Sequence, residues 1–488
     1  MDTMELREAF RADAQLAGPP PMDPYESVLA RRQKSDRRRL ATLTAGLAVV
    51  TVVVLVPFGI SLVGPRDSQV AASPEIPYAD VFAAPTRGSL AEDAAFVDGV
   101  RQLSWAVPDV RAVPALPDAP VDTRSVVFAG DVADGRWALV IGANNSQPTG
   151  EAADPNIQTD VESLSDIAAV WFVGPAGAAP EQMEAASLPR GVAPDLPTSL
   201  YDGPTGALVV IAAPGDSIEV SPRPEVTADA TVTRSYTDTG STDGVAVVAL
   251  DPNPFSYAGM PPVQYRVTRG GVVIVEQAPD SSSIVKGPTQ PAVQLQYLRS
   301  QGVISGPGDM AQIMAAEVLT EYGLSPAEVE LYVHYVGSVP GPNGEPAGLT
   351  VLTVTFPSGA VLTRATWMQP LGGPQGPNDV TAFAGGPCVY ELSAAGVPVS
   401  ERILAIRCDV NSGREDPDTE STLVVLVPVG LVMSSLTALG DGGSVASFLG
   451  QAAGDGGVVM VPFPEGADRV VVELVDGTIL DEVPISAP

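Results

Sequence analysis

The sequence predicts a mainly β protein with one N-terminal transmembrane helix and two tandem β-rich extracytoplasmic domains, each opened by a helix. Three observations support this prediction. An apolar stretch without charge occupies residues 40–64, glycine and proline number 48 each, and short apolar runs separated by turn residues fill the rest of the chain. Hydrophobic residues make up 45% of the sequence, which argues against a disordered tail and favours folded β domains joined by Pro/Gly loops.

Residues 40–64 are long enough to cross a membrane, because a helix rises about 1.5 Å per residue and a hydrocarbon core is about 30 Å thick. Six bases directly precede the stretch: Arg31, Arg32, Lys34, Arg37, Arg38 and Arg39. Only Arg66 follows it closely. This asymmetry predicts a cytoplasmic N-terminus and an integral membrane anchor. A cleaved signal peptide is the alternative, but the apolar run is longer than the core of such a peptide.

The predicted segments follow from this span and from the turn-rich stretches around it. They are a cytoplasmic basic arm (1–39), the transmembrane helix (40–64), a stalk (65–87), a first β-rich domain (88–280), a linker (281–305) and a second β-rich domain (306–488).

The first domain is predicted to begin with a helix. Ser89 and Glu92 form a capping box, and Phe96, Val100 and Leu103 follow at helical spacing. The expected strands are 126–129, 137–141, 168–173, 207–212, 231–236, 245–250, 263–268 and 272–276.

The second domain follows the same plan. A helix is predicted over 309–322, ended by Gly323, and a second capping box is expected over 325–328. The expected strands are 329–336, 349–356, 361–367, 389–392, 403–407, 423–429, 458–462, 470–474 and 479–483.

Several stretches of the two domains pair in the same order, which predicts an internal duplication. The pairs are 208–221 with 423–435, 243–252 with 455–466, 263–276 with 468–482 and, more loosely, 171–180 with 389–398. Coincidence between common strand-and-turn patterns is the alternative.

The charge of the exterior part limits its partners. Residues 1–39 hold 8 bases and 7 acids, so 18 of the 26 bases and 51 of the 58 acids follow the apolar stretch. Such an acidic surface repels nucleic acids and anionic lipid headgroups. We therefore expect no nucleic-acid partner, and we expect instead an envelope component or another exported protein.

Few residues point to a chemical site. Cys388 and Cys408 are the two cysteines, and their predicted exterior location favours a disulfide. His334 is the single histidine and lies in a strand pattern, so neither a metal site nor a cofactor is expected. The stretches 215–217 and 283–286 resemble the nucleophile motifs of an esterase family and of penicillin-recognising enzymes, but the partner residues of both motifs are missing.

The arm, the span and the general composition resemble those of membrane-anchored exterior proteins of high-GC Gram-positive bacteria, which include some anti-sigma regulators. The chain lacks the zinc-type His/Cys motif of many such regulators. We expect a non-catalytic binding or sensor protein of the cell envelope. The alternatives are a regulator whose cytoplasmic arm holds a partner, and an extracytoplasmic hydrolase.

Overall fold

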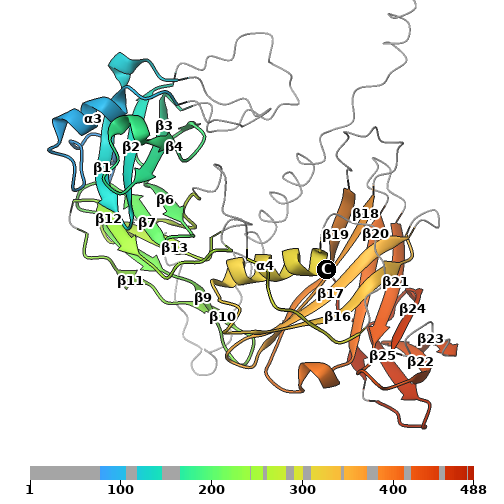
Figure 1. The fold of residues 1–488 in the computed structure, drawn as a ribbon. Helices are drawn as coiled ribbons and strands as arrows, with labels where there is room; N and C mark the ends of the chain where they lie inside the picture. The colour runs from blue at the N-terminus through green and yellow to red at the C-terminus, as the bar shows by residue number, and fades with distance from the viewer. Residues whose placement is uncertain are drawn as a thin grey trace, which may run out of the picture. The chain divides into compact units, whose positions relative to one another are not determined.

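The computed structural model describes residues 77–105, 118–144, 165–241, 243–255, 261–281, 291–299, 309–341, 346–370, 383–411, 419–449, 457–480 and 482–487. These residues form a mainly β protein with several sheets, as the sequence predicts (Figure 1). The predicted arm, the predicted span with its six flanking bases, and most of the stalk lie outside the described residues. Among the described helices, none has the length and apolar character needed to cross a membrane.

The described residues between 77 and 281, called the N-terminal half below, hold one α-helix and three main sheets. The elements are α3 (Ala94–Arg101), β1 (Ser125–Val132), β2 (Gly135–Ala143), β3 (Ile167–Pro175), β4 (Glu184–Ala185), β5 (Arg190–Gly191), β6 (Thr198–Asp202), β7 (Ala207–Ile211), β8 (Ser217–Ser221), β9 (Pro224–Val226), β10 (Val232–Arg234), β11 (Thr237–Asp238), β12 (Val245–Ala249), β13 (Gln264–Arg269) and β14 (Val272–Gln277). The main sheets have the orders β1-β2-β3-β4 with β5 also on β3, β12-β7-β6, and β11-β8-β13-β14, and β9 and β10 form a separate hairpin.

These elements stack in four layers. Helix α3 buries Phe96 and Val100 against one face of the five-stranded sheet. The other face of that sheet packs, through Trp171, on Val209 of the three-stranded sheet. Alternate residues of β7, such as Leu208, point to the opposite face and pack on the four-stranded sheet. Strand β7 is therefore covered on both faces, which explains why all five of its residues are apolar and buried.

Residues 291–487, the C-terminal half, hold a comparable set of elements. They are β15 (Gln296–Tyr297), α4 (Met310–Tyr322), β16 (Glu330–Val339), β17 (Ala347–Thr355), β18 (Val361–Pro370), β19 (Phe383–Ser393), β20 (Leu404–Asn411), β21 (Thr419–Leu426), β22 (Met433–Gly440), β23 (Gly443–Leu449), β24 (Val458–Pro462), β25 (Arg469–Leu474) and β26 (Val483–Pro484). The sheets have the orders β15-β16-β17-β18-β19, β20-β21-β24 and β23-β22-β25-β26.

The C-terminal half repeats the four layers. Helix α4 packs Met314 and Leu319 on Leu352 of the five-stranded sheet. The opposite face of that sheet packs, through Trp367, on the sheet of β20, β21 and β24. A third core separates that sheet from the one formed by β22, β23, β25 and β26.

Strand order pairs the two halves element by element. The order β12-β7-β6 matches β24-β21-β20, and β11-β8-β13-β14 matches β23-β22-β25-β26. Isolated parallel bridges join Tyr201 to Ser281 and Ile406 to Ser486, so each half ends with the same contact to the first strand of its three-stranded sheet. By this order, β3 corresponds to β18. The predicted pairing of 171–180 with 389–398 is therefore wrong, because 389–398 begins within β19.

The first predicted helix begins later than its capping box. Its N-cap is Asp93, whose side chain accepts from the amide of Phe96. Ser89 instead accepts, through Oγ, the amide of Asp131, and the amide of Leu90 donates to Ala129 O. This segment is thus bonded to the end of β1 and cannot begin the helix.

The second helix is confirmed at both ends. Asp309 caps α4 by accepting the amides of Ala311 and Gln312, and Gly323 ends it in the left-handed region with φ 60°. The second predicted capping box, over 325–328, forms a turn before β16 and not a helix start, although the Ser325 amide does donate to Glu328 Oε2.

Candidate functional site

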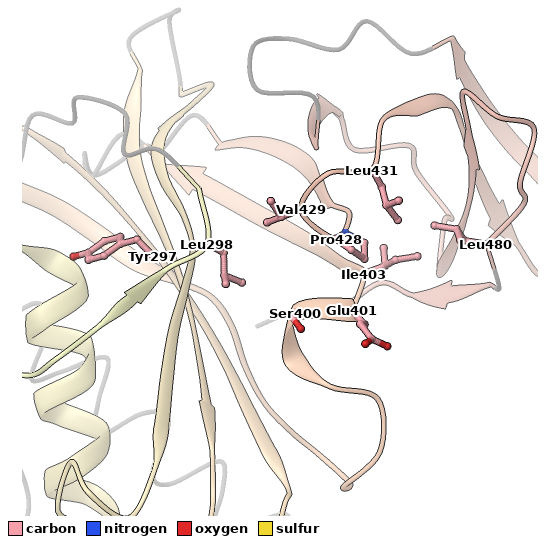
Figure 2. A pocket seen from close by; sticks show the side chains of 9 residues that line it. All are labelled: Tyr297, Leu298, Ser400, Glu401, Ile403, Pro428, Val429, Leu431 and Leu480. Carbon is pink, nitrogen blue, oxygen red and sulfur yellow. The ribbon is translucent and has the colours of Figure 1, made fainter.

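A pocket of about 660 Å³ in the C-terminal half is the candidate functional site, and we call it the C-terminal groove. Its lining residues are Tyr297, Leu298, Ser400, Glu401, Ile403, Pro428, Val429, Leu431 and Leu480. Figure 2 shows Ile403 and Pro428 near the middle, with Leu431 and Leu480 on one side and Leu298 on the other. Six of the nine lining residues are aliphatic or proline, so the groove presents an apolar surface.

Loops at the ends of buried strands position this surface. Ile403 directly precedes β20 and follows a short 3₁₀ helix, Val399–Glu401. Pro428, Val429 and Leu431 belong to the turn between β21 and β22, where Gly430 takes a φ of 90° that suits glycine best. The strands on either side fix the turn, because β21 lies in the middle of its sheet.

The apolar character continues outside the groove. Val429 is 56% exposed, Val432 43%, Val475 68% and Ile479 69%. Val432 follows the lining turn in sequence, and Ile479 precedes the lining residue Leu480. Val475 lies beside Val432, because the Val475 amide donates to Val432 O at 3.0 Å.

Polar groups lie at the edge of the groove. Glu401 is an exposed carboxylate, and Ser400 is exposed beside it, as Figure 2 shows. The Tyr297 hydroxyl donates to Asp309 Oδ2 at 3.3 Å, and burial, with the nearby Asp309 carboxylate, raises the pKa of Tyr297. None of the groove-lining residues is a histidine, a lysine or a cysteine.

Arg299 holds the back of the lining turn. Its Nη2 donates to Val427 O, and its Nη1 donates to His334 O at 3.0 Å. Burial lowers the pKa of this guanidinium. The N-terminal half has an arginine in the corresponding place: Arg87 Nη1 donates at 2.8 Å to Ala212 O, which follows β7 as Val427 follows β21.

The single histidine lies inside the C-terminal half. His334 is 3% exposed, and its Nε2 is 3.0 Å from Thr353 Oγ1 on the neighbouring strand. Burial lowers the pKa of His334 to about 3, and the positive charges of Arg299 and Arg402 act in the same direction. Within the described part of the chain, no group of three or more His, Cys, Asp or Glu side chains is placed to hold a metal ion.

The other predicted sites fall in several places. Cys388 on β19 and Cys408 on β20 lie at disulfide distance. In the esterase-like motif, Asp216 is bound by Arg269 and Ser217 begins β8, whereas the single histidine lies on β16 in the C-terminal half and has Thr353 as its side-chain partner. The 283–286 motif and the six topology-setting bases lie outside the described residues.

The sequence did not reveal the groove, because residues 423–429 were predicted as one strand. Strand β21 ends at Leu426, and Pro428-Val429-Gly430 form the turn. Proline and glycine two positions apart are a turn signal that would have indicated this boundary.

Comparison with models of known protein families gives no match, and comparison with curated proteins gives none either.

Proposed function

We propose that the chain is a single-pass, membrane-anchored binding protein of the bacterial cell envelope, with its β-rich halves outside the cytoplasm and no catalysis of its own. The apolar stretch 40–64 and the six bases before it support the anchor and its orientation. The acidic composition after this stretch favours a partner that is neither a nucleic acid nor an anionic lipid.

We also propose that the two halves are tandem domains that arose by duplication, each opened by a helix. Matching strand order and matching four-layer packing support this proposal. Two residue pairs add to it. Arg87 and Arg299 bond to corresponding carbonyls, and Trp171 and Trp367 occupy corresponding strands and pack on the three-stranded sheets.

The observation that carries the binding function is the C-terminal groove. It combines a volume of about 660 Å³ with a mostly apolar lining and an exposed valine at its edge. Apolar pockets with a few polar groups are the usual form of ligand sites. Burial of an apolar partner group here would be favourable by about 25 cal/mol per Å² of apolar surface removed from water.

Site-specific photocrosslinking in the producing cells tests this function. A photoreactive phenylalanine analogue replaces Val429 in the full-length chain, and in a matched control it replaces Val247 on β12, which is 50% exposed against 56% for Val429. We expect a discrete adduct with an envelope component at position 429 that is absent at position 247. Absence of any adduct at 429, or the same adducts at both positions, would overturn the proposal.

A further inference from the structure

The N-terminal half contains a chain segment in the place that corresponds to the C-terminal groove. Residues 79–82 lie there in the same chain. Val81 is fully buried, its amide donates to Pro194 O at 2.7 Å, and its carbonyl accepts from Arg87 Nη2 at 2.8 Å. Val81 and Phe82 share a core with Ala213 in the turn after β7.

The residues around this segment correspond to the lining of the groove. Ala213 and Asp216 lie in the turn between β7 and β8, and Pro428 and Leu431 lie in the turn between β21 and β22. Pro194 and Asp195 precede β6, as Val399 and Ser400 precede β20.

The backbone around these preceding residues supports the match. The amide of Leu196 donates to Ala193 O, and the amide of Glu401 donates to Pro398 O, so both halves form the same kind of turn before the strand. The two places are thus bounded by the same elements.

The chain enters the first sheet differently in the C-terminal half. Val293 forms two hydrogen bonds with Gln312 of α4, because its amide donates to Gln312 Oε1 and its carbonyl accepts from Gln312 Nε2. Leu298 then pairs with Val333 on β16. The described residues before β15 are therefore held at the helix, whereas those before Arg87 lie against the turn after β7.

The site of residues 79–82 and the C-terminal groove differ in one pair of residues. In the N-terminal half, Arg269 Nη1 donates to Ala79 O at 3.4 Å and to Asp195 O at 3.1 Å, while the guanidinium is bound to Asp216. In the C-terminal half, Leu474 ends β25 as Arg269 ends β13, and Leu431 takes the place of Asp216. The groove therefore lacks the charged contact to the segment backbone and has the Leu431 side chain in its lining instead, while Leu474 is buried.

We infer that the C-terminal groove binds an extended apolar peptide segment of another exported protein, in the way that residues 79–82 lie against the N-terminal half. This inference rests on the proposed binding function and names the chemistry of its partner. Apolar side chains like those of Val81 and Phe82 would fill the groove, and Leu431 in place of Asp216 favours a segment without charge at the position of Ala79.

A peptide-labelling experiment on the purified full-length chain tests the inference. The probe is an acetylated octapeptide with the sequence of residues 77–84, PYADVFAA, in which a photoreactive leucine analogue replaces the valine. A second peptide with aspartate in place of the phenylalanine is the control. We expect saturable labelling that mass spectrometry locates on the segments 400–403 and 428–431, and weak labelling by the control peptide.

Two protein variants make the experiment specific to the groove. Val429→Asp places a charge on the groove edge. We expect it to lower labelling about tenfold, because binding of the peptide would bring an apolar side chain against this carboxylate and remove water from it. Val247→Asp, at a similarly exposed valine, should leave labelling unchanged. Circular dichroism of both variants confirms that they fold.

The outcomes separate the inference from the proposed function. Unsaturable labelling, equal labelling of the two Asp variants, or labelling confined to the N-terminal half would overturn the peptide inference. A crosslink in cells from position 429 to a glycan, a lipid or this same chain would also overturn it. If the crosslink is to a glycan or a lipid, the binding function stands without the peptide. If position 429 gives no adduct in cells and the peptide does not label, both proposals are wrong.

Discussion

Arg269 forms a two-point ion pair with Asp216: Nε donates to Oδ1 and Nη2 to Oδ2, both at 2.9 Å. The two side chains are 7% and 3% exposed, so this is a buried pair. It joins the end of β13 to the turn between β7 and β8. The hydrogen bond from Arg269 to Asp216 raises the pKa of the guanidinium. The corresponding pair in the C-terminal half is Leu474 and Leu431.

Removal of one partner of this pair should be more harmful than removal of both. Asp216→Leu leaves a buried guanidinium without its counter-charge, Arg269→Leu leaves a buried carboxylate without its own, and such a loss costs about 3–5 kcal/mol. The double variant Asp216→Leu/Arg269→Leu recreates the leucines of the C-terminal half, and we expect it to cost less than either single change. Hydrogen exchange of the amides in β8 and β13 of the full-length chain measures the loss.

The C-terminal half provides the internal control for this cycle, because protection of β22 and β25 should not change. If the single effects simply add in the double variant, the ion pair contributes no coupling and the prediction is wrong.

Buried His334 should make the C-terminal half less stable in mild acid. Its pKa is about 3 in the folded chain and about 6.5 when unfolded. A depressed folded pKa means that the unfolded chain binds the proton first. Above pH 6.5 the imidazole is neutral in both states and does not lower the free energy of unfolding. That free energy falls as the pH drops from 6.5 toward 3. Between pH 7 and pH 5 the loss from this one group is about 2 kcal/mol.

The variant His334→Gln isolates this effect, since the amide keeps a polar partner for Thr353 Oγ1 and does not titrate. Urea unfolding of the C-terminal half can be monitored by hydrogen exchange of the β16 and β17 amides at pH 7 and at pH 5. The free energy of unfolding should fall less between the two pH values in the variant than in the original chain. If the free energy of unfolding depends on pH equally in the two proteins, burial does not lower the pKa of His334 and the prediction is wrong.

Several elements were predictable because one strong physical pattern determines each. The apolar runs of β7 and β21 follow from burial on both faces, and Gly323 ends α4 because it alone among the neighbouring residues takes a positive φ without strain. Strand β8 was missed because it has only five residues, although Ile218 and Val220 alternate with polar residues, and β22 was missed because a register shift between Met433 and Ser435 breaks its alternation.

The candidate site was less predictable than the fold. A groove depends on which loops meet, and loop positions leave no periodic signal in the sequence. Arg87 and Arg299 are isolated arginines, so their common role at the turns after β7 and β21 is evident only from their hydrogen bonds. The predicted first helix began too early because Ser89 and Glu92 match the sequence pattern of a capping box. In the fold, Ser89 Oγ instead accepts the amide of Asp131 at the end of β1.

The six bases between residues 31 and 39 should determine the orientation of the proposed membrane anchor. Replacement of all six by glutamine removes the charge asymmetry around residues 40–64, so we expect a mixed orientation. Protease added to intact cells should digest the C-terminal half of the original chain, and a smaller fraction of the variant. Arg66→Gln is the matched control and should keep the original orientation, because it removes charge from the opposite side. Unchanged digestion of the six-base variant would show that other features set the topology.

The pair Cys388 and Cys408 should be oxidised in the exported protein and should stabilise the C-terminal half alone. The two cysteines are 20 residues apart in sequence and join β19 to β20, two strands of different sheets. A crosslink that closes a loop of this length contributes about 3 kcal/mol to the free energy of unfolding by restricting the unfolded chain.

A thiol-reactive polymer tests whether the bond forms. After denaturation without reductant, the polymer should fail to shift the full-length chain on a gel, and after reduction two polymer molecules should attach to each chain. The double variant Cys388→Ser/Cys408→Ser should lose protection in β19 and β20, whereas the cysteine-free N-terminal half should be unaffected. Two reactive thiols in the unreduced chain would mean that these residues lie close together without a bond, and the extracytoplasmic placement would lose one of its supports.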